Sequence, residues 1–183
     1  MYIMLLDGHP GGPWGNVRPM DSLAGTRGKT FDDLTPGDTF LSPSKTVDQC
    51  DVEAFAELSG DSNPVHLDAE FARGTLFRGR IAHGLLVQSI ASGLAWQTGV
   101  FRGTIVALAE MTMRFEAPVR PGDTIRVELS VLSKEPDPGP RRGHVRWRTR
   151  VRNQNDETVI DGEWLTLLHR ARTPRSLGEE SKQ

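Results

Sequence analysis

The sequence predicts an α+β fold in which one buried helix is wrapped by an antiparallel sheet. Residues 81–96 are apolar on most faces, and a helix of that kind is buried in a protein core. Residues 124–133 and 144–152 alternate between apolar and polar side chains, as do strands with one face on a core. A strand near Phe40, the helix and then four strands favour one sheet that packs on one helix.

At 183 residues the chain is long enough for one domain with a full core, and it contains no internal repeat. Residues 1–29 are rich in glycine and proline, so we predict an irregular arm. Residues 30–169 are expected to form the folded domain, and the charged residues 170–183 a disordered tail. Two interpretations of the arm stay open: translation starts at Met20, or Trp14 packs on a partner subunit.

An amphipathic helix is predicted before the central one. Thr46 and Gln49 have the spacing of a capping box, apolar residues follow for about three turns, and Gly60 is well placed as the C-terminal cap. The next residues contain Pro64, which fixes its own φ and disfavours the α region at Asn63. We therefore predict a tight, non-helical loop after Gly60, followed by a short helical turn that Asp68 caps.

Asp61 and His66 lie on this loop, where a carboxylate and an imidazole can point into the same cleft. Such a pair can hold and deprotonate a water molecule. The alternatives are that Asp61 closes a turn and that His66 is a structural loop residue. His83 and Gly84 stand where the central helix is expected to begin, and free N–H groups there favour negative charge. We expect His83 to be a structural residue rather than a second base, and Gly84 has close packing as its alternative role.

The remaining strands are predicted from their apolar patterns. Residues 105–115 form a strand with Val106 and Leu108 packed on the core, and Met111, Met113 and Phe115 are further candidates for packing. Residues 158–168 form the last strand, with a bulge at Gly162. The sequence EPDPGPRRG predicts a long loop between the two strands before it.

Composition excludes several classes of protein. A formal net charge of −2 gives no basic field for nucleic acid. A single cysteine, Cys50, excludes internal disulfides and thiolate metal clusters. No apolar run reaches the roughly 18 residues of a membrane span, and no basic segment precedes the short apolar patch at the N-terminus, so neither a membrane helix nor a signal peptide is expected. We expect a cytoplasmic protein.

The motif GDSNPVH, followed by IAHG and SIASG, resembles the MaoC-like family of (R)-specific enoyl-CoA hydratases and dehydratases over roughly residues 31–168. The resemblance implies a single hotdog fold, paired as a homodimer or a higher homo-oligomer. It implies that Asp61 and His66 are the catalytic dyad that activates water and that the Gly84 N–H binds the thioester oxygen. Asn63 matches the asparagine that shapes the loop, and Ser92 falls where some members have a serine that lines the site.

The implied activity is reversible hydration of trans-2-enoyl-CoA to (R)-3-hydroxyacyl-CoA. It needs no metal and no cofactor, because coenzyme A enters as part of the substrate. Alternatives are a dehydratase of 3-hydroxyacyl thioesters on CoA or acyl carrier protein, and a non-catalytic acyl-binding subunit. Arg78 and Arg80 compete for the coenzyme A phosphates with a ladder of alternate arginines in residues 146–152, whose other interpretation is a solvated sheet face.

Overall fold

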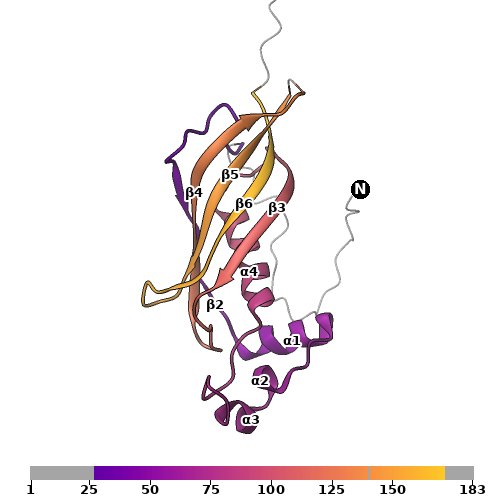
Figure 1. Cartoon of the computed structure of the whole chain (residues 1–183), viewed down its shortest axis with the longest axis vertical. Helices are drawn as coiled ribbons and strands as arrows, with labels where there is room; N and C mark the ends of the chain where they lie inside the picture. The colour runs from indigo at the N-terminus through magenta and orange to yellow at the C-terminus, as the bar shows by residue number, and fades with distance from the viewer. Residues whose placement is uncertain (1–26, 140, 172–183) are drawn as a thin grey trace, which may run out of the picture.

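The computed structural model describes residues 27–139 and 141–171. Residues 1–26, with Trp14 and Met20, therefore lie outside the described part, as do residues 172–183 of the predicted tail. Figure 1 shows a long twisted sheet with helix α4 against it, and helices α1, α2 and α3 gathered at one end of the molecule. No helix in the described ranges is long and apolar enough to cross a bilayer.

The sheet consists of antiparallel strands in the order β1-β4-β5-β6-β3, and β2 also pairs with β4. Their bounds are β1 (Thr39–Leu41), β2 (Lys45–Thr46), β3 (Ile105–Phe115), β4 (Thr124–Pro136), β5 (Arg142–Arg152) and β6 (Thr158–His169). The predicted alternation of β4 and β5 is confirmed, because every second side chain is buried against the helix. The α+β hotdog arrangement of one helix wrapped by one antiparallel sheet is thus present (Figure 1).

The central helix α4 (Gly84–Gln97) begins three residues later than predicted. Residue His83 is its N-cap with extended backbone, and the Ala82 N–H donates to the Val119 carbonyl at 2.7 Å, which ties the preceding segment to the end of the sheet. One face of α4 forms the core together with β4, β5 and β6. Its opposite stripe is open, with Leu85 60% and Trp96 38% exposed.

The side chains of strand β3 are more exposed than the sequence predicts. Val106, Leu108, Met111 and Phe115 are 38–54% exposed instead of packed, whereas Met113 and Ile105 contact the core. The reason is that β3 is an edge strand whose pairing with β6 slips at two irregularities, so its alternation does not follow the helix.

The predicted bulge at Gly162 is also wrong, because this residue pairs in register with both neighbouring strands. A Cβ there would collide with the Thr112 carbonyl, so glycine permits close approach of β3 and β6. The predicted long loop between β4 and β5 is shorter than expected, because β4 continues to Pro136 and β5 begins at Arg142.

Helix α1 (Gln49–Ser59) begins after Asp48, so the capping box predicted at Thr46 is wrong. Asp48 donates its N–H to Asp51 Oδ2 at 3.0 Å, whereas Thr46 belongs to β2. Gly60 is the C-cap as predicted, with φ of 77° in the left-handed region. Two short helices follow, α2 (Pro64–Leu67) and α3 (Ala69–Arg73), and Asp68 caps α3 by accepting two N–H groups.

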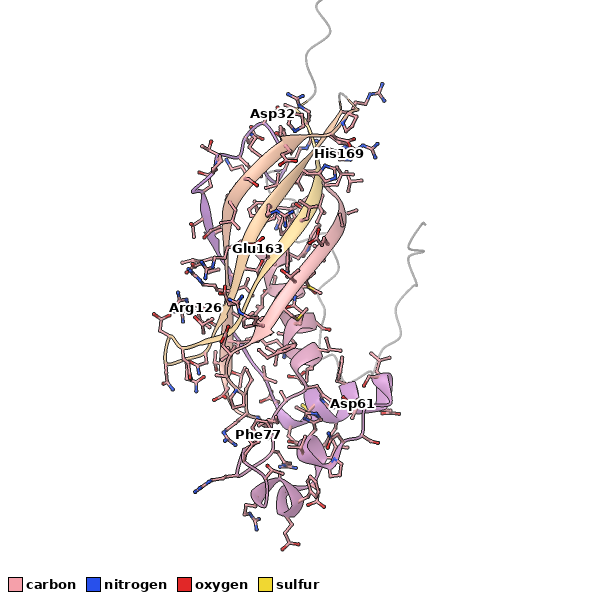
Figure 2. The ribbon with its side chains drawn as sticks, viewed as in Figure 1. Asp32, Asp61, Phe77, Arg126, Glu163 and His169 are labelled. Atoms are coloured by element: carbon pink, nitrogen blue, oxygen red, sulfur yellow. The ribbon has the colours of Figure 1, made fainter. Side chains whose placement is uncertain are left out.

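The packed unit extends slightly past the predicted limits of 30 and 169. The Gly28 N–H donates to the Arg102 carbonyl at 2.8 Å, and at the other end Arg170 Nη2 pairs with Asp32 Oδ1 at 2.8 Å. Both contacts lie at the end of the sheet where Figure 2 labels Asp32 and His169. The helices α1 to α3 lie at the opposite end, beside Asp61.

Candidate active site

His66 lies on a one-turn helix, not on the non-helical loop that the sequence predicts. Pro64 is the first residue of α2, where its missing N–H and fixed φ suit a helix start. Asn63 caps this turn, and its Oδ1 accepts the Val65 N–H at 3.2 Å. Asn63 therefore shapes the segment, and only residues 60–63 before it are non-helical.

One nitrogen of the His66 ring makes a hydrogen bond to the backbone, and the other has no such bond in the described part of the chain. His66 is buried, and its Nδ1 lies 2.8 Å from the Ile81 carbonyl oxygen. A carbonyl oxygen only accepts, so Nδ1 carries the hydrogen in the neutral ring and Nε2 carries a lone pair. A lone pair on Nε2 is what a general base needs.

Asp61 is held by its backbone and leaves its carboxylate exposed. Its N–H donates to Ser59 Oγ at 3.2 Å, and its carbonyl oxygen accepts from His83 Nε2 at 2.9 Å. Among the described residues, its Oδ1 receives only the long N–H bond of Asn63, at 3.4 Å. The carboxylate is thus placed by the chain while most of its accepting capacity remains open.

Asp61, His66 and His83 come together in space. One potential ligand atom from each lies within 4.8 Å of the others. The two imidazole rings stack with centroids 3.7 Å apart and planes inclined by 32°, so their lone pairs, which lie in the ring planes, do not converge on one point as tetrahedral metal ligands do. A water molecule that hydrogen-bonds the carboxylate and His66 Nε2 suits this spacing better.

His83 is 2% exposed, and burial lowers its pKa, against the opposing effect of its hydrogen bond to the Asp61 carbonyl. It is therefore a neutral ring at pH 7. Sequence reasoning assigned it only to the helix start, although its side chain makes no capping hydrogen bond to α4. The sequence feature that could have pointed to a role of His83 in the site is its place directly before Gly84 in IAHG.

Gly84 joins this cluster to an apolar cavity of about 400 Å³. It is the first residue of α4, where N–H groups have no partner inside the helix. A Cβ on Gly84 would lie 2.6 Å from Phe115 Cε1, so the ring rests directly on the glycine. Asp61 and His66 do not line the cavity. Its walls are formed by Phe77, Ile81, Ala82, Gly84, Leu85, Val87, Phe115, Glu116, Ala117, Pro118, Val119, Val159 and Ile160.

The other predicted substrate-binding residues lie on α4 and on the connector before it. Ser92 lies eight residues beyond Gly84, about 12 Å along the helix, and its exposed Oγ donates to the Ser89 carbonyl at 2.8 Å. Arg78 and Arg80 lie in the connector between α3 and α4. Arg80 Nη1 donates weakly to the Leu67 carbonyl at 3.5 Å, while Arg78 is exposed.

The arginine ladder lies on the outer face of the sheet, and its members meet carboxylates. The shortest pairs join Arg148 to Asp161 at 2.8 Å and Arg150 to Glu128 at 3.1 Å. Arg146 pairs with Glu163, which Figure 2 labels on the sheet well away from Asp61. These contacts favour the interpretation as a solvated sheet face.

Residues 32–152 match the family model described as "MaoC like domain". The chain is 37% identical over 138 residues to the 3-hydroxybutyryl-CoA dehydratase of Methylorubrum extorquens, which covers 75% of this chain and 83% of that protein. It is 40% identical over 106 residues to Protein MaoC of Klebsiella aerogenes, which covers 58% of this chain. The matched part is only 31% of that longer relative.

The fold is similar to that of a solved hydratase. The R-hydratase PhaJ1 of Pseudomonas aeruginosa, in its unliganded form, superposes with a TM-score of 0.66 at 35% sequence identity. The match covers 84% of this chain and 96% of that one.

Proposed function

Because this chain belongs to the MaoC-like family, whose named relatives are hydro-lyases, we propose that it adds water reversibly to trans-2-enoyl-CoA to form (R)-3-hydroxyacyl-CoA. One observation carries the proposal: a ring nitrogen of His66 and the exposed Asp61 carboxylate lie within 4.8 Å of each other, beside the helix start at Gly84. This arrangement supplies a base, a second group that orients water, and N–H donors for an oxyanion.

In this mechanism Asp61 and His66 hold the water between them, and His66 Nε2 accepts its proton as the oxygen bonds to C3. The C2–C3 π electrons move to C2 and the thioester oxygen, which gives an enolate. The Gly84 N–H and the α4 dipole stabilise the negative charge on that oxygen. The protonated dyad then returns a proton to C2, which completes the addition of water and restores His66. Dehydration follows the same steps in reverse.

The cavity next to Gly84 is proposed to take the acyl chain. Its walls are almost entirely apolar, and it begins at the residue that holds the thioester oxygen. Arg78 and Arg80 follow α3 at the same end of the molecule, where Figure 2 labels Phe77, and they are proposed to meet the coenzyme A phosphates. Ser92 would line the site only in an assembly that brings its exposed helix face to a partner's acyl chain.

We expect the protein to be at least a homodimer. Strand β3 has an unpaired edge in the described chain, and its exposed Phe115 lines one cavity together with Leu85 of the open stripe of α4. An open edge with apolar side chains is stabilised by pairing with another copy. Leu108→Glu should therefore dissociate the dimer. Leu132→Glu, a matched change of a 41% exposed leucine on β4, should not.

Light scattering measures the oligomeric state of the wild type and of both leucine variants. A wild-type monomer that is fully active at the concentration measured would contradict the proposed assembly. So would equal behaviour of the two leucine variants.

The function is tested with trans-2-enoyl-CoAs of increasing chain length, followed by loss of the conjugated thioester absorbance, and with chiral analysis of the product. The expected result is turnover to the (R) alcohol. The (S) product would reject the mechanism, and tight binding without turnover would favour a non-catalytic acyl-binding subunit.

The dehydratase alternative is supported by the named dehydratase relative. It is tested by comparing kcat/KM for the same acyl group on CoA and on acyl carrier protein.

A further inference from the structure

His83 contacts both members of the proposed dyad without belonging to it. Its Nε2 donates to the Asp61 carbonyl at 2.9 Å, and its ring covers the His66 ring with centroids 3.7 Å apart. The Phe55 ring also neighbours it, with centroids 5.0 Å apart and planes inclined by 55°. A buried side chain with these neighbours has little freedom to move, so whatever it contacts is held as well.

The hydrogen bond to Asp61 indicates which nitrogen of the His83 ring carries the hydrogen. A carbonyl accepts from His83 Nε2, so Nε2 carries the hydrogen and Nδ1 carries a lone pair. Within the described chain that Nδ1 is buried without a partner. A buried polar atom left in this way is destabilising. An apolar ring would avoid that cost, so the donor on the opposite nitrogen gives a reason to keep histidine.

We propose that His83 is a positioning residue for the hydration reaction: its Nε2–H fixes the Asp61 backbone, and its uncharged ring fixes the plane of His66, whose tautomer the Ile81 carbonyl sets. This inference rests on the proposed function for its kinetic consequence. Neutrality is part of the role, because a charged ring in this stack would repel the proton that His66 takes from water. Burial of His83 lowers its pKa and so keeps the ring uncharged at pH 7.

Two replacements separate the two contacts. His83→Phe keeps a flat ring on His66 and removes the donor to Asp61, whereas His83→Gln keeps an N–H donor of similar reach and removes the ring. His83→Ala removes both. A residue that positions others without touching substrate should act on kcat and leave KM nearly unchanged. We expect His83→Ala to lower kcat by about 10- to 100-fold with KM within about twofold, and the other two variants to fall between.

The matched control is His144, a half-buried histidine on β5, changed to Ala, Phe and Gln. These changes should leave kcat as in the wild type. Thermal melting confirms that each variant is folded, and the Phe and Gln variants serve if the Ala variant is not. The proposal is overturned if His83→Ala keeps kcat within twofold, if KM changes in place of kcat, or if a variant with one contact equals the wild type.

A second measurement does not depend on activity. Imidazole ¹⁵N–¹H correlation spectra should show the Nδ1–H tautomer for His66 and the Nε2–H tautomer for His83 in the wild type. In His83→Ala, the Nδ1–H signal of His66 should broaden because the ring is no longer held in one plane, and a signal as sharp as in the wild type would overturn the positioning role. If the wild-type protein shows this pattern but hydrates no enoyl thioester, the proposed function fails while the arrangement of the two rings stands.

Discussion

The helical end of the molecule and the outer face of its sheet both collect ionisable side chains, but they use them in opposite ways. On the sheet, Arg148 gives two hydrogen bonds to Asp161, at 3.1 and 2.8 Å, and Arg114 adds a third at 3.1 Å. At the helical end, Asp61 and His66 are held mainly through backbone groups, and their reactive atoms stay open. The charged groups on the sheet are occupied by each other, whereas Asp61 and His66 are held in place with reactive atoms that a substrate can meet.

The two regions also differ in how their ionisable groups affect the free energy of unfolding. Ion pairs on an exposed face are each worth roughly 0–1 kcal/mol. Two buried imidazoles cost free energy unless they are hydrogen-bonded, and His83 Nδ1 has no partner in the described part of the chain. Thr149 Oγ1 and Arg152 Nε on the sheet are also buried without a hydrogen-bond partner in the described chain, so the two regions differ in the open Asp61 carboxylate rather than in an unpartnered atom alone.

The largest effect should come from the dyad. Asp61→Asn and His66→Ala should each lower kcat by about 10²–10⁴, because each removes a group that binds or deprotonates water. His144→Ala on the sheet is the matched control and should leave kcat unchanged. Steady-state hydration of an enoyl-CoA measures all three. Turnover near that of the wild type in either folded dyad variant would refute the assignment.

Much of this site could be predicted from the sequence because its signals are local. Asp61, Asn63 and His66 lie within six residues, and Gly60 and Asp68 terminate and start helices through backbone geometry that neighbouring residues determine. The one-turn helix α2 escaped prediction because proline disfavours helix before it but suits its first position.

What the sequence did not reveal depends on contacts between distant segments. The partners of the arginine ladder follow from the register of β5 with β4 and β6, which places Glu128 opposite Arg150 and puts Asp161 diagonal to Arg148. The exposure of β3 follows from its place at the sheet edge, although its composition suits a core. His83 looked like a helix-start residue because its two contacts, Asp61 and His66, precede it by 22 and 17 residues.

The second effect in size concerns Gly84. Gly84→Ala would place a methyl group against the Phe115 ring, which must move, so we expect a loss of roughly 1–3 kcal/mol of unfolding free energy and a fall in kcat. The matched control is Gly93→Ala on the same helix, where an added Cβ meets no described atom within 4 Å. That change should stabilise by about 0.5–1 kcal/mol. Urea unfolding and kcat measure both variants, and equal effects would contradict the structural reason given for Gly84.

A third prediction concerns how the ion pair of Asp161 with Arg148 makes the free energy of unfolding depend on pH. The hydrogen bonds from Arg148 lower the pKa of Asp161 below its usual 3.8, against the opposing effect of burial. Stability from a depressed carboxyl pKa is present above the unfolded-state value and is lost as pH falls through the folded-state value. Asp161→Asn should therefore cost roughly 1 kcal/mol at pH 7, and the difference should shrink below about pH 3.8. Urea unfolding at both pH values checks this, and an unchanged difference at low pH would contradict it.

The smallest effect should be that of Arg146→Gln. Its pair with Glu163 spans 3.4 Å between side chains that are 37% and 45% exposed, so unfolding should change by less than about 0.5 kcal/mol. The KM for an enoyl-CoA should also stay unchanged, because the sheet face is not proposed to contact the phosphates. Arg78→Gln is the informative counterpart. It should raise KM severalfold for the CoA thioester and leave it unchanged for the pantetheine thioester, which lacks the nucleotide phosphates. A raised KM in Arg146→Gln with none in Arg78→Gln would move the coenzyme A site to the sheet and reverse the contrast between the two regions.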